Sequence, residues 1–336
     1  MITLLLFIPI ITSLYLFFIN NSKKIKIIGL ISTLINFFFS IIMWIQFDYS
    51  NPYPQFFFKY TENISVGIDG ISLLFILLTT FIMPISILAG WSIKNNIKYF
   101  ILCLLGLESI LIGVFVVLDI LMFYICFESS LIPMFLLIGL FGSKPQGLPL
   151  NGGKAISTRI YASYQFFLMT LAGSLFMLLG ILFLYAQTGT TNYLLISTSN
   201  ITPYAQTIIW IGFFLSFAIK TPIVPFHQWL PLAHTEAPLS GSIILAALML
   251  KLSTYGFIKY SIILFPDASY YFTPLIYVLC VIGIIYSSFT TLRQIDIKKI
   301  IAYSSIGLFG PFVEIISIDA TNYMREIYKI CKILVL

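Results

Sequence analysis

Residues 98–141 read KYFILCLLGLESILIGVFVVLDILMFYICFESSLIPMFLLIGLF, and this stretch decides the fold class. It holds two apolar runs, 98–117 and 120–141, each close to the ~20 residues that a helix needs to cross a bilayer. Only Leu118 and Asp119 separate the two runs, so Asp119 is expected at a tight turn at the membrane interface. The stretch therefore predicts two helices that cross a membrane in opposite directions.

Composition extends this prediction to the whole chain. The 336 residues are 60% hydrophobic and only 9% charged, with a mean hydropathy of +1.03. A soluble domain carries roughly 25% charged residues, so this chain lacks the inventory for a water-exposed surface. The net charge of +6 does not indicate nucleic-acid binding, because the basic residues lie in short loops and form no basic stripe.

Apolar runs of near-spanning length continue along the chain, which predicts an all-α polytopic membrane protein with about ten transmembrane helices. No gap between the runs is large enough for a soluble domain, and the first run is expected to be a retained span rather than a cleaved signal. The runs are 2–19, 27–46, 69–91, 98–117, 120–141, 161–186, 206–224, 238–265, 271–291 and 299–317.

Charge asymmetry between alternate loops gives an expected orientation. Before the tail, the sparsely charged side holds only Lys59 and Lys259. The basic side is expected in the cytoplasm or its organellar equivalent, with the N-terminus on the other side. The basic side holds Lys23, Lys24, Lys26, Lys94, Lys98, Lys144, Lys154, Arg159, Arg293, Lys298 and Lys299.

Four charged residues fall inside the expected spans: Glu108, Glu128, Lys220 and Lys251. A charge at the centre of a spanning helix costs roughly 2.5–3.5 kcal/mol, so such residues usually pair, face a water-filled cavity or mark an ion path. These four are therefore the candidate functional residues. The alternative for each is a structural ion pair between helices, and for Glu108 a pairing with Lys220 or another cation is equally open.

Prolines flank two of these charges. Pro133 follows Glu128 by five residues, and a proline there removes a backbone hydrogen bond and bends the helix. Pro222 and Pro225 follow Lys220 at once, which predicts a helix break whose carbonyls need other partners or water. A lysine beside broken backbone at membrane depth is typical of transporters.

Motifs for bound cofactors are incomplete. His227 and His234 lie seven residues apart around Pro231, which is no zinc spacing, and no Pro-Cys-x-x-Cys completes a deaminase signature after His234. A loop position or a proton-relay role stays open for both histidines. The sequence Gly152-Gly153-Lys154 lacks the remaining residues of a phosphate loop, so we expect no nucleotide, flavin, iron–sulfur cluster or metal on this chain.

Four longer motifs resemble one family, the antiporter-like membrane subunits of NADH:ubiquinone oxidoreductase (respiratory complex I). The similarity runs from about residue 1 to Ser305 and is strongest from 100 onward. The motifs are SFAIKTPIVPFHQWLPLAHTEAP at 216–238, FYICFESSLIPMFLLIG at 123–139, LMLKLSTYG at 248–256 and TLRQIDIKKIIAYSS at 291–305.

The resemblance implies a multi-pass, proton-translocating subunit of the mitochondrial inner membrane, built from inverted five-helix repeats. Its partners would be the lipid bilayer and other membrane subunits of complex I, with no nucleic acid. NADH, flavin, iron–sulfur clusters and ubiquinone would be bound by other subunits, so this chain would carry no redox chemistry and no cofactor. Residues 1–95 would be N-terminal helices, 96–265 the first repeat, and 266–336 the start of an incomplete second repeat and a tail.

The resemblance also implies roles for single residues. Glu128 matches the acid of the fifth helix, Lys220 the lysine of the broken seventh helix, and Lys251 the lysine of the eighth. Glu108 matches an acid of the helix before Glu128, and the two histidines fall in the motif after the break. In the implied mechanism, redox energy released elsewhere separates a Glu128–Lys220 pair, and Lys220 then hands a proton toward Lys251.

Two other functions share these motifs. A stand-alone cation/proton antiporter subunit would show sodium-dependent transport in isolated vesicles. A non-transporting scaffold would tolerate the loss of Lys220 and Lys251.

Beyond Ser305 the chain reads IGLFGPFVEIISIDATNYMREIYKICKILVL, which departs from the family pattern. We therefore expect a truncated or intron-extended reading frame. Sequencing of the mature transcript tests this expectation: a spliced message should continue with further spans, whereas a message that stops after Leu336 would contradict it.

Overall fold

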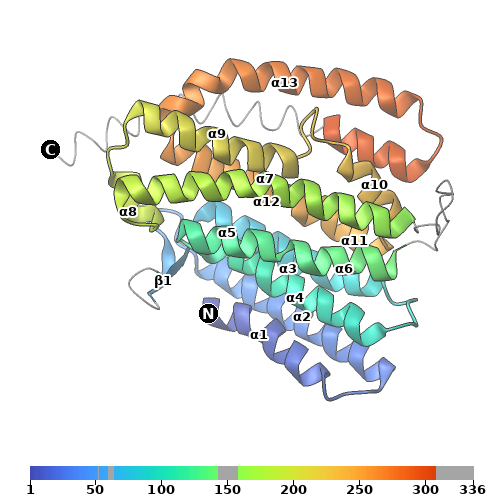
Figure 1. Ribbon diagram of the computed structural model, residues 1–336. Coiled ribbons are helices and arrows are strands. Elements are labelled where there is room, and N and C mark those ends of the chain that lie inside the picture. Colours follow the sequence, from blue (N-terminus) through green and yellow to red (C-terminus); the bar gives the residue numbers. More distant parts are fainter. Residues whose placement is uncertain (52, 60–63, 143–157, 308–336) are drawn as a thin grey trace. The chain divides into compact units, whose positions relative to one another are not determined.

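The computed structural model describes residues 1–51, 53–59, 64–142 and 158–307, and these residues are mostly helical (Figure 1). Gly152-Gly153-Lys154 and the divergent tail from residue 308 lie outside these ranges. The chain divides into two compact units. Unit 1 comprises Met1–Phe167 and Glu236–Leu248, and unit 2 comprises Leu168–Thr235 and Met249–Leu336.

Unit 1 is built around one buried helix. Helix α4 packs against α1, α2, α3, α5 and α6, and its residues are buried almost without interruption from Leu104 to Val116. A helix that is apolar all round belongs in a core, which is how this sequence behaves. The helices of unit 1 are α1 (Ile2–Leu16), α2 (Ser22–Gln46), α3 (Gly70–Ala89), α4 (Ile97–Val116), α5 (Ile120–Ser129), α6 (Leu131–Phe141) and α11 (Leu239–Ile244).

Small and polar residues allow the helices of unit 1 to approach closely. The hydroxyl groups of Ser40 on α2 and Thr80 on α3 lie 2.8 Å apart in a buried hydrogen bond. A Cβ atom on Gly29 would lie 2.7 Å from the side chain of Ile101, so only glycine fits between α2 and α4 there. Close backbone approach and hydroxyl pairing are the usual means of helix association in membranes.

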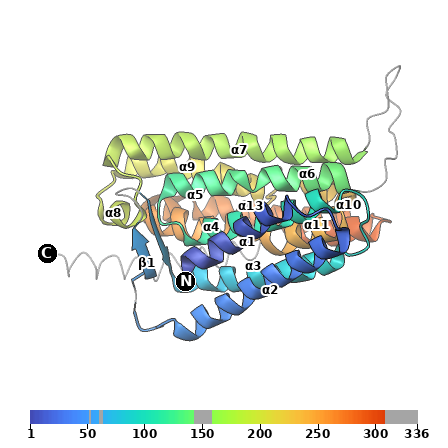
Figure 2. The same cartoon turned by 90° about the horizontal axis from the view of Figure 1, so that it is seen from below.

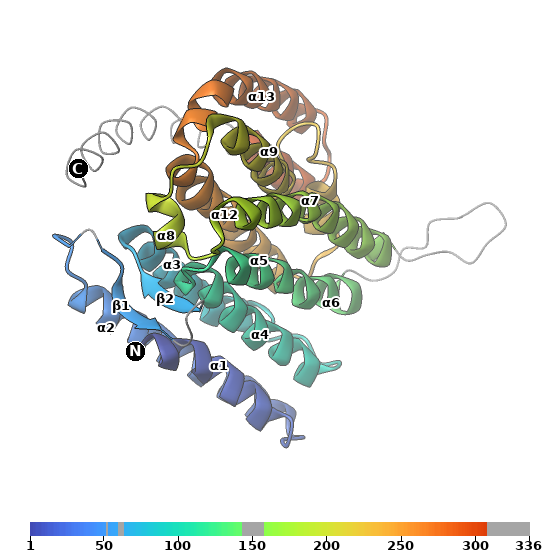
Figure 3. The same cartoon turned by 60° about the vertical axis from the view of Figure 1, so that its left-hand side comes forward.

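A two-stranded antiparallel hairpin interrupts the all-α pattern expected from the sequence. Strand β1 (Gln55–Lys59) pairs with β2 (Ser65–Ile68), with Phe58 opposite Val66 (Figure 3). Both strands fall between the apolar runs 27–46 and 69–91, in a segment whose aromatic and β-branched residues favour strand pairing. The amide of Leu118 donates to the carbonyl of Ser65 at 3.0 Å, which ties the hairpin to the end of α4.

Unit 2 is organised around α9, which packs against α12, α13 and the π-helical segment η2. Its elements are α8 (Tyr193–Thr198), α9 (Pro203–Lys220), α12 (Leu250–Gly256), η2 (Phe257–Ile262) and α13 (Pro266–Leu292). Three elements cross the division between the units: α7 (Thr158–Thr188), α10 (Trp229–Glu236) and the π-helical segment η1 (Leu245–Met249). A further helical segment covers residues 297–307.

Trp210 of α9 fixes the packing of unit 2. Its ring stacks between Phe214 and Phe272, at centroid distances of 4.9 and 4.5 Å. The indole N–H donates to the Ser269 hydroxyl at 3.0 Å, and this hydroxyl donates to the carbonyl of Ser261 at 2.9 Å. The stacked rings and the hydrogen-bond chain hold α9, η2 and α13 in one arrangement.

The expected helices are largely confirmed, whereas the number of spans is not. Within the described residues, seven helices are long and apolar enough to cross a membrane. The run 2–19 forms a helix of only 15 residues, and the run 206–224 lies in a helix that ends at Lys220. The chain is a multi-pass, mostly helical membrane protein, and the count of ten helices and the inverted repeats stay predictions.

Gly256 should be essential for the contact between α9 and α12. A Cβ atom there would lie 2.5 Å from the buried ring of Phe217, so Gly256→Ala should cost about 1–3 kcal/mol through overpacking. Gly106→Ala is the matched control, because nothing lies within 4 Å of its added Cβ. Thermal unfolding of the purified chain in detergent should show a lower Tm for the first variant only; equal Tm values would contradict the packing argument.

Candidate functional site

The break after α9 places Lys220 at a closed helix end. Lys220 is the last residue of α9 and is only 3% exposed. Residues 221–228 form turns, and α10 begins at Trp229. The break predicted from Pro222 and Pro225 is therefore confirmed.

The carbonyls released at the break find partners within ten residues along the chain. The carbonyl of Ala218 accepts from the amide of Ile223 at 2.9 Å. The carbonyl of Ile219 accepts from the indole N–H of Trp229 at 2.8 Å. An unsatisfied backbone group in lipid costs several kcal/mol, so these bonds allow irregular backbone beside a buried lysine.

Lys251 lies in the middle of an irregular helix. It belongs to α12, which follows η1 directly and runs on into η2. Single π-helical turns inside α-helices occur frequently at functional sites. Because α9 and α12 pack against each other in unit 2, Lys220 and Lys251 come from neighbouring helices.

Glu128 occupies the last turn of α5, beside a second break. Helix α5 ends at Ser129 and α6 begins at Leu131, and the two follow one another end to end (Figure 2). Pro133 supplies no amide hydrogen for the carbonyl of Ser129, so the expected interruption beside Glu128 is confirmed. Both carboxyl oxygens of Glu128 are shielded from solvent.

Glu108 has a neutral partner. The side-chain amide of Asn36 on α2 donates to Glu108 Oε1 at 3.0 Å and to the carbonyl of Leu5 at 3.2 Å. Glu108 and Asn36 are both fully buried, and Glu108 Oε2 has no hydrogen-bond partner among the described residues. A pairing of Glu108 with Lys220 or another cation stays a prediction.

The two histidines after the break are both buried. His234 is 6% exposed, and burial, together with the positive charges of Lys298 and Lys251, lowers its pKa to about 4. Burial also lowers the pKa of His227, against the opposing effect of a hydrogen bond to the backbone of Pro225. Burial thus disfavours the charged form of both imidazoles.

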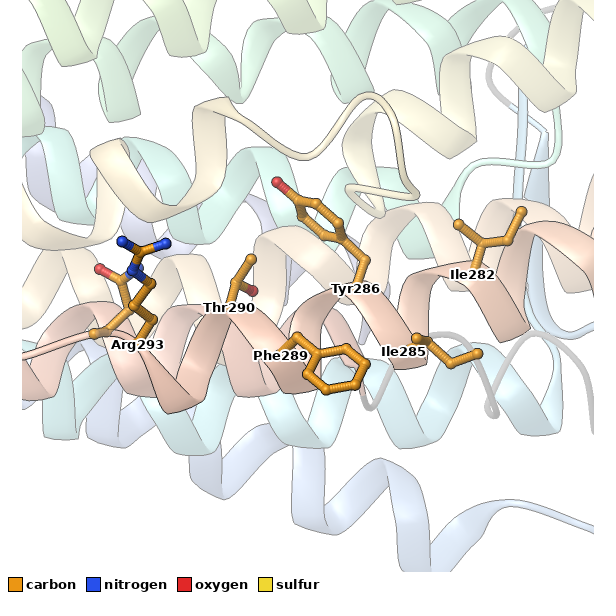
Figure 4. A pocket seen from close by; sticks show the side chains of 7 residues that line it. Ile282, Ile285, Tyr286, Phe289, Thr290 and Arg293 are labelled. Atoms are coloured by element: carbon orange, nitrogen blue, oxygen red, sulfur yellow. The ribbon is translucent and has the colours of Figure 1, made fainter.

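A groove on α13 lies beside His227 but offers no acid–base pair. It has a volume of about 500 Å³, and the Tyr286 ring on its wall meets the His227 ring edge-on at a centroid distance of 4.9 Å. Figure 4 shows apolar side chains over most of the lining and Arg293 at one end. The described lining residues are Ile282, Ile285, Tyr286, Phe289, Thr290, Arg293 and Gln294.

The position predicted from the sequence for one buried charge was wrong. Lys259 was expected in a loop with Lys59, but it lies inside η2 and is only 4% exposed. Its ammonium group donates to the hydroxyl of Tyr255 at 2.9 Å. The run 238–265 extends past Lys259, so run length was the signal that could have placed it in the span.

The candidate residues divide between the units. Glu108 and Glu128 belong to unit 1, whereas Lys220, His227, His234 and Lys251 belong to unit 2. Asn36, which donates to Glu108, belongs to no motif, so its role as a partner of Glu108 could not be predicted from the sequence.

Comparisons with known proteins agree on one family. Residues 117–331 match the family model described as NADH:quinone oxidoreductase/Mrp antiporter, transmembrane, and this match extends beyond Ser305, where the motif comparison had placed its end. NADH-ubiquinone oxidoreductase chain 4 of Arabidopsis thaliana is 51% identical over 89% of this chain and 60% of its own length. The chain 4 of Mycosarcoma maydis is 48% identical over 91% and 63%.

A solved structure supports the same fold. A chain of respiratory complex I from Thermus thermophilus superposes with a TM-score of 0.78 at 26% identity, over 92% of this chain and 63% of that one. This chain thus spans less than two thirds of the length of these relatives.

The pKa of His234 should depend on its lysine neighbours. Removing the Lys298 charge by Lys298→Gln relieves a repulsion of the imidazolium form, so the His234 pKa should move upward from about 4. Histidine-selective NMR titration of the purified chain can measure this, because the sequence contains only two histidines. Lys299→Gln is the control, since Lys299 is paired with Asp296 at 3.2 Å; an equal shift in both variants would refute the assignment.

Proposed function

This chain belongs to the NADH:quinone oxidoreductase/Mrp antiporter membrane family, and from this premise we propose that it is a proton-translocating membrane subunit of respiratory NADH:ubiquinone oxidoreductase. The relatives that support this choice are named as chain 4 of that enzyme. Their presence in plants and fungi supports the inner mitochondrial membrane as its location. Electron transfer from NADH to ubiquinone would take place on other subunits, and this chain would move protons.

The observation that carries the proposal is the closed break that holds Lys220 on α9, next to the helix of Lys251. An amine in a dry, low-dielectric site changes its proton affinity strongly when a neighbouring charge appears or disappears. A change of charge near Lys220 would release its proton toward Lys251. Irregular backbone beside such a site supplies polar groups and room for water along the route.

Glu128 would act as the charge that controls Lys220. The assignment rests on the resemblance of the two motifs and on the interrupted helix beside Glu128, which allows local movement. Paired with Glu128, Lys220 would stay protonated; once the pair separates, the ammonium would lose its counter-charge and its proton. Coupled groups of this kind titrate as a unit rather than as single residues.

The neutral histidines would continue the route. His234 is buried and lies in the field of Lys251 and Lys298, so its protonation depends on the charges of both lysines. A neutral imidazole has one nitrogen that donates and one that accepts, which suits a relay between amines and water. Glu108, which accepts a hydrogen bond from Asn36, would contribute to the charge of unit 1.

The stand-alone antiporter is the second candidate, because the family description also covers Mrp antiporters. The identity of about half of all residues with complex I relatives favours the respiratory subunit. Sodium-dependent proton transport by isolated vesicles would favour the antiporter instead.

Glu128→Gln should uncouple proton pumping from NADH oxidation while the complex stays assembled. The substitution removes the charge that controls Lys220 but keeps the size and hydrogen-bonding capacity of the side chain, so NADH oxidation should continue while protons pumped per NADH fall. Dye-based proton uptake by reconstituted complex, normalised to NADH oxidation, measures the ratio.

Asp296→Asn is the matched control, because Asp296 is an exposed carboxylate that pairs with Lys299 at 3.2 Å. It should leave the ratio unchanged. Full pumping by an assembled Glu128→Gln complex would refute the proposed role.

A further inference from the structure

Asn36 holds Glu108 from α2, a helix that the proposed proton route does not use. Asn36 lies in the middle of α2 and is fully buried, as is Glu108 on α4. Its side-chain amide donates to Glu108 Oε1 at 3.0 Å and to the carbonyl of Leu5 on α1 at 3.2 Å. Helices α1, α2 and α4 pack against one another within unit 1, so three helices meet at this amide.

The contact with Leu5 determines which way the amide faces. A backbone carbonyl accepts hydrogen bonds and donates none, so the NH2 group of Asn36 must point toward Leu5. An amide turned by 180° would place Oδ1 against this carbonyl, and two acceptors would then repel each other. The second hydrogen of the NH2 group goes to Glu108 Oε1. The fold therefore directs an N–H donor at one particular oxygen of Glu108.

Neighbouring polar residues of α2 have other partners. The hydroxyl of Thr33, one turn before Asn36, donates to the carbonyl of Leu30 in the same helix at 3.0 Å. The hydroxyl of Ser40, one turn after Asn36, lies 2.8 Å from the hydroxyl of Thr80 on α3. These two hydroxyls are satisfied on α2 and α3, whereas the amide of Asn36 reaches α1 and α4.

The two carboxyl oxygens of Glu108 are consequently unequal. Oε1 accepts from Asn36, whereas Oε2 is buried and has no hydrogen-bond partner among the described residues. In a protonated carboxyl group the carbonyl oxygen is the better acceptor, and the hydroxyl oxygen carries the hydrogen that can be donated. A donor fixed at Oε1 favours that atom as the carbonyl oxygen. It leaves Oε2 as the atom that takes up and releases a proton.

We propose that Asn36 is a positioning residue that holds Oε1 of Glu108 and thereby makes Oε2 the proton-exchanging atom of this acid. The inference rests on the proposed function, because an exchanging atom matters only where protons move. It extends the candidate site to α1 and α2, which lie in residues 1–95, the part expected to precede the first repeat. Asn36 itself gains and loses no proton in this role.

Infrared spectroscopy of the purified chain tests the hydrogen bond itself. Labelling the glutamate carboxyl groups with a heavy carbon isotope isolates the glutamate bands, and the band that disappears in Glu108→Gln belongs to Glu108. Asn36→Leu removes both donors at similar size and should shift this band. Thr33→Val is the matched control, because Thr33 is equally buried one turn away and donates to its own helix, so the band should stay in place.

A band that stays in place in Asn36→Leu overturns the proposal, and so does an equal shift in Thr33→Val, which would indicate a general change in packing. If Asn36→Leu does not fold, Asn36→Ala is measured in its place, and an unshifted band there likewise overturns the proposal. This measurement involves no pumping, so its result is independent of the Glu128→Gln pumping ratio, and the two proposals fail separately.

Proton pumping by the reconstituted complex distinguishes a positioning role from a purely structural one. Asn36→Leu should lower the number of protons pumped per NADH, whereas Thr33→Val should leave it unchanged. In a complex that already carries Glu108→Gln, adding Asn36→Leu should cause no further loss, because Asn36 acts through the carboxyl group. A further loss in the double variant contradicts the positioning role, as does full pumping by an assembled Asn36→Leu complex.

Discussion

The hydrogen bond from the Trp229 indole to the Ile219 carbonyl is the contact on which the site in unit 2 depends. A helix that ends within a membrane exposes carbonyls to a medium that offers no donors. Here the donors come from the eight residues after Lys220 and from the first residue of α10. The helix can therefore stop beside a buried lysine without the penalty that an open end would carry, and the same turn determines where His227 and His234 lie.

Close packing then determines which groups surround that lysine. The ring of Phe217 lies over Gly256, where no side chain intervenes, and also meets Phe257 at a centroid distance of 5.2 Å. Trp210 lies earlier on α9, and its indole N–H donates to the hydroxyl of Ser269 on α13. These contacts bury the facing sides of α9 and α12. In such surroundings a single charge acts over a longer range than it would in water.

The interruptions of helices were the features that could be predicted well from the sequence. Pro133 predicted the division between α5 and α6, and Pro222 and Pro225 predicted the end of α9, because a proline acts on the backbone locally.

Partners that are brought together by tertiary packing were not predictable from the sequence. Asn36 looks like any polar residue in an apolar run, and only the fold brings it to Glu108. Lys259 was assigned to a loop because its depth depends on where α13 begins, at Pro266. The hairpin was not predicted, because two short strands form only by pairing with each other and neither strand has a clear sequence pattern.

The electrostatics of unit 2 connect these observations. His234 has a low pKa in part because Lys251 and Lys298 are positive, so the proton affinity of the histidine reports the charge of the lysines. The coupling must be reciprocal, since a free energy shared by two sites acts equally on both. If Lys251 were neutral, part of this repulsion would disappear and the pKa of His234 would lie higher.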